Sequence, residues 1–373
     1  MMPEEKNAKN KIKKVSDGFP GRYWHKEGDK IQCDICPRFC RLNEGQRGLC
    51  FVRARQNNQM VLTTYGRSSG FCIDPIEKKP LNHFLPGVPI LSFGTAGCNL
   101  TCKFCQNWDI SKSRQFDKLQ SKASPAVIAN VALKTNSRAV AYTYNDPVIF
   151  MEYAVDTARA CRELGIMNVA VTAGYICPDP RKEFFSYMDA ANVDLKGFTE
   201  TFYKTLCTAR LESVLDTLKY LKHDTGVWIE LTDLLIPGEN DSPREIERMS
   251  KWIVKNLGSE VPIHFTAFHP DYKMLEKSRT PPSTLLMARK IALHEGIKYV
   301  YTGNIHHKQT ASTWCHNCGE LVIGRDWHQL LGWHIKVRGD GVASCKSCGE
   351  HIPGVFEKKP GNWGRKRVPI RIR

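Results

Sequence analysis

The chain has 373 residues, of which 42% are hydrophobic, and a formal net charge of +16. This length allows one large domain with appendages or two to three smaller domains, and the composition excludes a largely disordered chain. No apolar run is long enough to span a membrane, and the charged N-terminus lacks the apolar segment of a secretory signal. We therefore expect a cytoplasmic protein without membrane association.

The basic charge concentrates at the two ends of the chain. Residues 1–20 are expected to form a disordered basic arm, and residues 357–373 a loose basic tail. The simplest interpretation is that both are solvated and mobile. The alternative is that they contact an anionic partner such as RNA.

Between these ends, residues 21–87 combine cysteines and turn residues with little periodicity, which indicates a compact lobe held by metal. From 88 to 310, strand-like and helix-like segments alternate, so we expect parallel strands joined by five or six crossover helices. One helical segment, 201–223, is expected to break near Cys207. The seven expected strands lie near residues 88–97, 139–145, 168–174, 192–197, 227–237, 262–270 and 298–304.

This alternation predicts an α/β fold with a partial or complete TIM-like (β/α) barrel. An N-terminal Cys-rich lobe precedes the barrel, and a zinc-ribbon-like unit follows it at residues 311–356. In such barrels the chemistry takes place at the carboxyl ends of the strands. Candidate functional residues are therefore sought there first.

Fifteen cysteines are unusual inside a cell, where clustered thiols indicate metal or redox centres rather than disulfides. Three clusters are present, at residues 33–50, 98–105 and 315–348. The remaining cysteines are scattered and are interpreted as buried, unreactive thiols: Cys72, Cys161, Cys177 and Cys207.

The last cluster has two C-x2-C pairs separated by 26 residues, which is the spacing of a zinc ribbon. Four thiolates in this pattern form a closed tetrahedral site, and zinc is favoured over iron. The predicted ligands are Cys315, Cys318, Cys345 and Cys348.

The first cluster has the spacing C-x2-C-x3-C-x9-C, formed by Cys33, Cys36, Cys40 and Cys50. Both zinc and an auxiliary iron–sulfur cluster are compatible with this spacing. A cluster here would relay electrons, whereas zinc would only organise the lobe.

The middle cluster contains only three thiols, Cys98, Cys102 and Cys105. Three thiolates on an iron–sulfur cluster leave one iron with an open position, which distinguishes catalytic metal centres from closed structural ones. Because the loop follows a strand, it is expected at the barrel mouth. Phe104 would shield part of the cluster from water.

This loop, C-x3-C-x-aromatic-C directly after the first barrel strand, resembles that of the radical S-adenosylmethionine (SAM) enzymes. The segments "YTYNDP", "NVDLKGFTETFYKTLC" and "FTAFHPDYKM" and the N-terminal "CDICPRFCRLNEGQRGLC" resemble the radical SAM member of the AmmeMemoRadiSam system, which is related to pyruvate formate-lyase activating enzymes. The resemblance covers roughly residues 22 to 356.

The resemblance implies an enzyme whose three loop cysteines bind a [4Fe–4S] cluster, with SAM on the fourth iron. One-electron cleavage of SAM would give a 5′-deoxyadenosyl radical that abstracts hydrogen from an unidentified substrate. It also implies an electron donor of the flavodoxin or ferredoxin type, and it suggests Memo-like partners. Two alternatives stay open: an RNA-modifying radical SAM enzyme and a non-catalytic, metal-stabilised binding module.

Five further cofactor-binding positions follow from the resemblance. Asn145 and Asp146 match the place where SAM's amine is met, although the shorter Asp146 is equally suited to cap the next helix. Asp194 and Lys196 match a pair that holds SAM's ribose and carboxylate, with a plain salt bridge as the alternative. His269 matches a histidine near the adenosyl group, with a structural histidine as the alternative.

Overall fold

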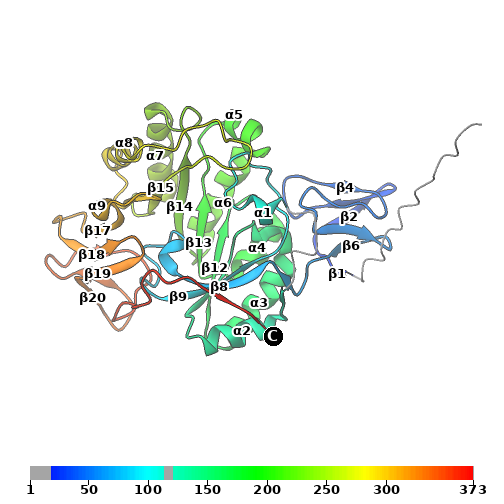
Figure 1. Cartoon of the computed structure of the whole chain (residues 1–373), viewed down its shortest axis with the longest axis horizontal. Coiled ribbons are helices and arrows are strands. Elements are labelled where there is room, and N and C mark those ends of the chain that lie inside the picture. Colours follow the sequence, from blue (N-terminus) through cyan, green and yellow to red (C-terminus); the bar gives the residue numbers. More distant parts are fainter. Residues whose placement is uncertain (1–17, 113–120, 373) are drawn as a thin grey trace, which may run out of the picture.

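A nine-stranded sheet forms the centre of the computed structural model, which describes residues 18–112 and 121–372 (Figure 1). Seven neighbouring strands are parallel and occur in chain order across the sheet. They are β9 (Pro89–Gly94), β11 (Ala139–Tyr142), β12 (Met167–Thr172), β13 (Ala190–Asp194), β14 (Trp228–Leu235), β15 (Ile263–Ala267) and β16 (Val300–Gly303). All seven expected strands are confirmed. Because β16 ends one edge, the barrel is partial.

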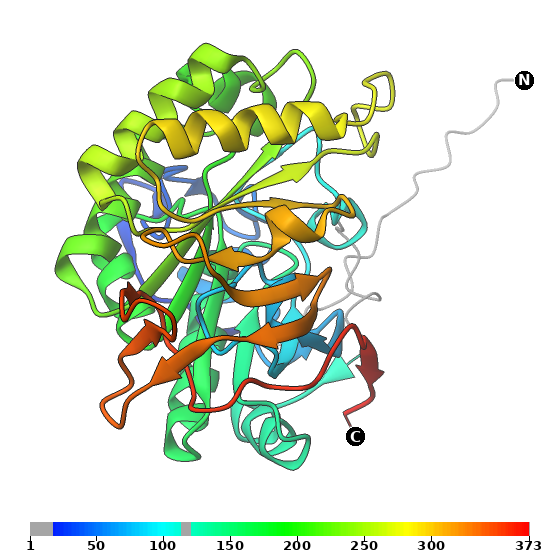
Figure 2. The same cartoon turned by 90° about the vertical axis from the view of Figure 1, so that its left-hand side faces the viewer.

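Amphipathic helices cover the outer face of this sheet (Figures 1 and 2). Helix α7 shows why they form: Ser242 caps its first turn, Pro243 occupies the first position, and its apolar residues recur every three or four positions and are buried. The covering helices are α2 (Pro125–Lys134), α3 (Met151–Glu163), α4 (Pro178–Ser186), α6 (Leu211–Asp224), α7 (Pro243–Leu257) and α8 (Pro282–His294).

The expected helix break near Cys207 is also confirmed. Helix α5 (Glu200–Phe202) passes into a π-helical turn, η4 (Tyr203–Cys207), and Thr208 then has a left-handed φ of 53°. A π turn widens the helix locally and often marks a functional position. The break directs the backbone of residues 206 and 207 toward the three-cysteine loop.

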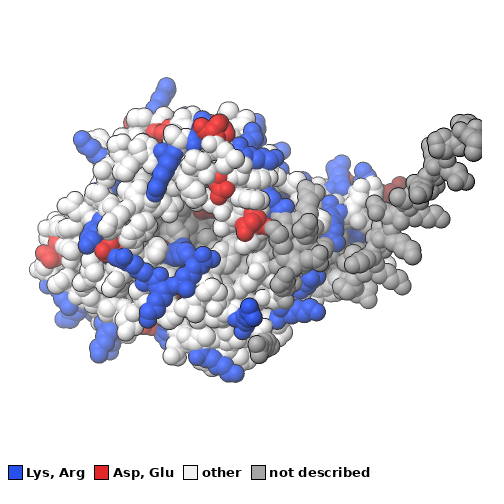
Figure 3. Space-filling model, viewed as in Figure 1, with Lys and Arg blue, Asp and Glu red and all other residues white. Residues whose placement is uncertain are grey.

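Two antiparallel strands extend the sheet beyond β9. Strand β8 (Gly70–Pro75) pairs with β9, and β23 (Val368–Ile370) pairs with β8. The expectation of a loose C-terminal tail is therefore wrong for residues 368–370. Arg365 lies 2.8 Å from Asp326, and in Figure 3 basic side chains gather over the path of this segment. Part of the positive charge of the tail is thus paired with an acidic residue of the folded protein.

The N-terminal lobe consists of two small antiparallel sheets. Residues 1–17 of the expected basic arm lie outside the described residues, whereas Phe19–Pro20 form β1. One sheet joins β1, β6 (Gln59–Leu62) and β5 (Arg53–Gln56). The other joins β2 (Trp24–Glu27), β3 (Lys30–Cys33) and β4 (Arg41–Leu42).

The C-terminal unit also has two three-stranded antiparallel sheets, and it lies at the front of Figure 2. Its own small core contains Cys315, Val322, Ile323, Ile335 and Ile352. The strands are β17 (Thr313–Trp314), β18 (Leu321–Asp326), β19 (Gln329–Trp333), β20 (Ile335–Val337), β21 (Ala343–Cys345) and β22 (His351–Ile352). This arrangement confirms the zinc-ribbon-like unit.

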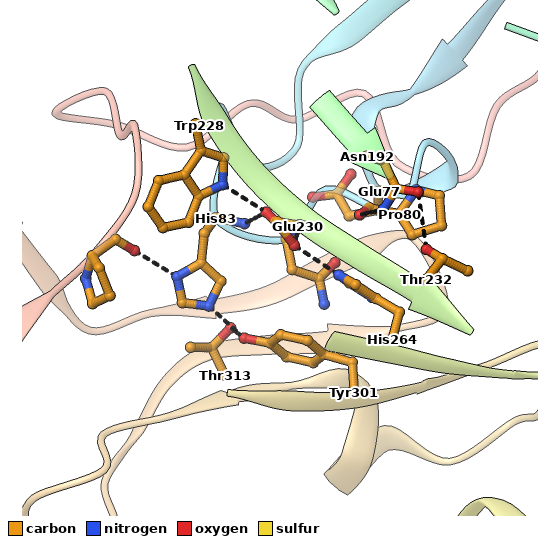
Figure 4. Close-up of polar contacts among 12 residues, drawn as sticks. Glu77, Pro80, His83, Asn192, Trp228, Glu230, Thr232, His264, Tyr301 and Thr313 are labelled. Carbon is orange, nitrogen blue, oxygen red and sulfur yellow. Dashed lines mark hydrogen bonds and ion pairs between the residues drawn. The ribbon is translucent and has the colours of Figure 1, made fainter. Parts of the chain in front are cut away.

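A buried polar network joins this unit to the amino ends of the barrel strands (Figure 4). Glu230 on β14 accepts hydrogen bonds from the backbone of Asn82 and His83 and contacts His264 at 2.7 Å. The His83 ring bridges Tyr301 and the Pro353 carbonyl, both at 2.6 Å. Because the amino ends of barrel strands serve stability rather than chemistry, we interpret this network as structural.

Within the described residues, no helix has the length and apolar character needed to cross a membrane.

Candidate active site

The three-cysteine loop begins where β9 ends, and protein contacts fix its backbone. Asn145 accepts from the Thr95 amide at 3.1 Å and donates to the Gly97 carbonyl at 2.8 Å. On its far side, the Thr101 and Lys103 amides donate to the carbonyls of Cys207 and Leu206. The loop is therefore held from two directions by residues from other strands and helices.

The three thiols of this loop do not form a single-ion site. Cys102 is buried, whereas Cys98 and Cys105 are partly exposed. Across the described ranges, the only group of three or more candidate ligands whose atoms lie within 4.8 Å of one another is at the C-terminus. Ligands of an iron–sulfur cluster bind separate iron atoms and need not approach one another this closely, so three thiolates on one loop are compatible with such a cluster.

The surroundings of Cys102 favour its thiolate form. A hydrogen bond from the Cys207 thiol, with positive charge from Lys196 and Lys112, lowers the pKa of Cys102 to about 6. Although the Cys98 side chain is partly exposed, the surrounding protein keeps water from much of it, and this desolvation raises the pKa of Cys98 to about 11. Because only the thiolate binds metal, the environment prepares Cys102 for ligation more than Cys98.

Cys207 is buried as expected, but its position beside a candidate ligand was not apparent from the sequence. It lies about one hundred residues from Cys102 along the chain, and its own spacing matches no metal motif. The one signal available was the expected helix break at this position, since such breaks occur at functional sites.

Asp194 is the last residue of β13, and Lys196 lies two residues beyond it at the barrel mouth. Their side chains form an ion pair of 2.7 Å, with exposed fractions of 32% and 17%. Burial alone would lower the pKa of Lys196, but Asp194, Cys102 and Cys207 raise it well above its usual value. The salt bridge considered from the sequence is therefore present, and it lies toward the candidate cluster ligands rather than on a remote surface.

Asn145 and Asp146 are both buried. Asp146 accepts from the Val148 amide at the start of η3 (Pro147–Phe150), from the Thr172 hydroxyl at 3.0 Å and from the Ala173 amide at 3.1 Å. Burial raises its pKa to about 6 despite these donors. Its capping role is thus realised, and contact with the SAM amine stays a prediction.

Phe104 is part of the three-cysteine loop, and His269 contacts the residue that follows its last cysteine. The His269 Nδ1 is 2.9 Å from the Gln106 side-chain nitrogen, directly after Cys105, and the His269 side chain is 53% exposed. Phe104 is buried against Phe202, with ring centroids 5.7 Å apart. The structure therefore brings His269 to the loop, while its contact with the adenosyl group and the shielding of the cluster by Phe104 stay predictions.

A cavity of about 410 Å³ lies beside this loop, toward the N-terminal lobe. Cys98, Ser111 and Lys112 form one wall, and Leu49 and Phe51 of the lobe form another. The Ser111 hydroxyl is 3.0 Å from the Cys105 sulfur. Lobe and barrel therefore meet at the candidate cluster.

The C-terminal cysteines form a compact site. The sulfur atoms of Cys315 and Cys348 are 3.6 Å apart, and those of Cys318 and Cys345 are 3.8 Å apart. A tetrahedral ion with metal–sulfur bonds of about 2.3 Å requires edges of about 3.8 Å. The four thiols therefore fit one tetrahedral metal ion.

Comparison with known proteins identifies the barrel. The family model described as "Radical SAM superfamily" matches residues 93–253, which include the loop, Asp194 and Lys196. The chain therefore contains a radical SAM domain. This domain makes the protein a radical SAM enzyme and implies a [4Fe–4S] cluster and SAM as its cofactors.

Two relatives extend the comparison of this radical SAM enzyme. An uncharacterized protein of Methanocaldococcus jannaschii, MJ0808, is 40% identical over 88% of this chain and 97% of its own length. The pyruvate formate-lyase-activating enzyme of Clostridium pasteurianum is 21% identical over 49% of this chain and 76% of its own. Similarity to MJ0808 thus reaches beyond the barrel.

Among solved structures, Streptococcus suis SuiB bound to S-adenosylmethionine aligns with a TM-score of 0.47. That alignment is 14% identical and covers 62% of this chain and 53% of SuiB.

Proposed function

We propose that this radical SAM enzyme holds its [4Fe–4S] cluster with Cys98, Cys102 and Cys105 and cleaves SAM there to start hydrogen abstraction from a substrate. When bound, the cluster and SAM supply one-electron cleavage of a sulfonium bond. The observation that carries the assignment is the three-cysteine loop at the end of β9, whose backbone is held by Asn145 on one side and by the Leu206 and Cys207 carbonyls on the other.

The residues around the loop have different roles in binding the cluster and SAM. In this proposal Lys196 offsets the negative charge of the thiolates, and the Asp194–Lys196 pair binds the polar groups of SAM. The 2.7 Å ion pair and the influence of Cys102 on Lys196 support these roles. Asn145 acts as a positioning residue, because its amide is used to hold the loop backbone. His269, joined to Gln106, is placed at the exposed rim.

The proposal also covers partners and the second metal. By resemblance, we propose a flavodoxin- or ferredoxin-type electron donor and Memo-like partner proteins. At the C-terminus, the sulfur separations of 3.6 and 3.8 Å favour a structural zinc ion.

Anaerobic reconstitution followed by dithionite and SAM tests the central claim. We expect 5′-deoxyadenosine from the wild type and from Cys161→Ala, which removes a buried thiol outside the three clusters, but none from Cys102→Ala. Iron and sulfide analysis accompanies each sample. Wild-type protein with a full cluster that gives no 5′-deoxyadenosine under several reductants would overturn the proposal.

A further inference from the structure

The fold brings the four cysteines of the N-terminal lobe to one place. Cys33, Cys36, Cys40 and Cys50 all line a single cavity, although they come from the end of β3 and two separate turns. The Cys33 amide donates to the Cys40 carbonyl at 2.9 Å, which closes the first turn. A shared cavity for all four thiols indicates one common ligand rather than four independent core positions.

The two cysteine turns have an unfavourable backbone. Phe39 precedes Cys40 with a φ of 46°, and Phe51 follows Cys50 with a φ of 69°. Aromatic residues rarely adopt the left-handed region, and such strain concentrates at ligand-binding turns. The strain is therefore located at the residues that orient two of the four thiols.

The spacing of these thiols differs from that of the C-terminal group. Within residues 18–112 and 121–372, no three of them have sulfurs within 4.8 Å of one another, whereas the C-terminal four satisfy this limit. One zinc ion would require separations of about 3.8 Å. A cluster spreads its ligands over several iron atoms and does not require its four sulfurs to approach this closely.

The walls of this cavity provide positive charge. Arg38 lines the cavity and donates to neutral acceptors, the Asn99 carbonyl at 2.8 Å and the Thr208 hydroxyl at 2.7 Å. Arg53, a second lining residue, is neutralised by Glu152. A cluster with four thiolates carries net negative charge, which the Arg38 guanidinium would offset.

The cavity shares a wall with the radical SAM loop. Asn99, which follows Cys98, lines it, and Leu49 lines both this cavity and the one beside Cys98. At Gly97, an added Cβ would lie 1.9 Å from the Cys50 carbonyl oxygen, so the two cysteine loops touch through their backbones. A group in this cavity would be separated from the first cluster only by these loops.

We propose that Cys33, Cys36, Cys40 and Cys50 hold a second iron–sulfur cluster that passes electrons to the cluster on the Cys98 loop. Four thiolates close its coordination, so SAM does not bind there. A reduced flavodoxin or ferredoxin gives it one electron, this electron moves to the first cluster, and one electron is consumed per SAM cleaved. The relay role rests on the proposed function, whereas the presence of the cluster does not.

Metal analysis of the full chain, reconstituted anaerobically, tests the second cluster. We expect about eight iron and eight sulfide per wild-type chain, with one zinc, and about four of each after combined Cys98→Ala, Cys102→Ala and Cys105→Ala. EPR of this reduced triple variant should keep one cluster signal. Cys161→Ala is the matched control and keeps both clusters.

Two results would overturn the cluster: wild-type protein with about four iron and a second zinc, or a triple variant without iron and sulfide. The wild-type count does not depend on any variant folding. A count of eight iron without 5′-deoxyadenosine would contradict the proposed function alone.

The relay is tested with Cys33→Ala plus Cys36→Ala in protein that retains the first cluster's EPR signal. Cleavage of SAM driven by reduced flavodoxin should be lost, while cleavage driven by dithionite persists, because dithionite can reduce the first cluster directly. Equal flavodoxin-driven rates in this variant and the wild type would contradict electron transfer through the second cluster.

Discussion

Arg53 and Glu152 form a two-fold ion pair in the interior, with nitrogen–oxygen distances of 2.8 and 2.9 Å and side chains 2% and 1% exposed. Arg53 belongs to the N-terminal lobe and Glu152 to helix α3 of the barrel. The pair therefore fixes the lobe, with its four cysteines, against the barrel.

Removing one partner of this pair should detach the lobe. Arg53→Met leaves Glu152 buried without a counter-charge, and such losses cost about 3–5 kcal/mol. We expect a lower midpoint in chemical denaturation and faster proteolysis within the lobe. Arg41→Met breaks the exposed pair with Glu27 and serves as the control, with a loss of at most about 1 kcal/mol. Equal losses for the two variants would contradict the anchoring role of Arg53.

His83 should make stability depend on pH. Burial lowers its pKa to about 4, from 6.5 in an exposed setting, so between these values the unfolded chain binds a proton that the folded protein does not. Acidification from pH 6.5 to 4 should therefore favour unfolding by up to roughly 3 kcal/mol. His83→Gln should flatten this dependence in urea unfolding at pH 7 and pH 5. The exposed His25→Gln is the control, and an unchanged slope in His83→Gln would refute the assignment.

Cys207 should influence the first cluster without being its ligand. Cys207→Ala removes the thiol that hydrogen-bonds to Cys102, and hydrogen bonds to cluster sulfurs help set the reduction potential. We expect unchanged iron content, a more negative midpoint potential in an EPR titration and slower SAM cleavage. Cys207→Ser keeps a donor and should shift the potential less. Loss of iron in Cys207→Ala would instead make Cys207 a ligand.

The C-terminal site should bind one zinc ion that folds its own unit. Cys318→Ala should lower zinc content by one per chain and open residues 311–356 to protease, because a ribbon with so small a core depends on its metal. The first cluster and its EPR signal should persist. Zinc content that does not change in Cys318→Ala would show that the ion binds elsewhere.

The parallel strands, the three-cysteine loop and the zinc-ribbon spacing could be predicted from the sequence. Each depends on a pattern of residues that lie close together along the chain. The capping role of Asp146 was also accessible, since Asp before Pro is a local helix signal. The pairing of β23 with β8 and the contact of Cys207 with Cys102 could not be predicted from the sequence. Each joins segments about one hundred or more residues apart, and neither leaves a mark on local periodicity.

The absence of a side chain at Gly97 limits which amino-acid substitutions this position can accept. With a φ of 81° and the Cys50 carbonyl occupying the space of a Cβ, any other residue there would push two cysteine-bearing segments apart at once. A single methyl group at this position would thus displace both the barrel loop and the lobe. Substitutions at the Gly97–Cys50 contact therefore affect the two parts together.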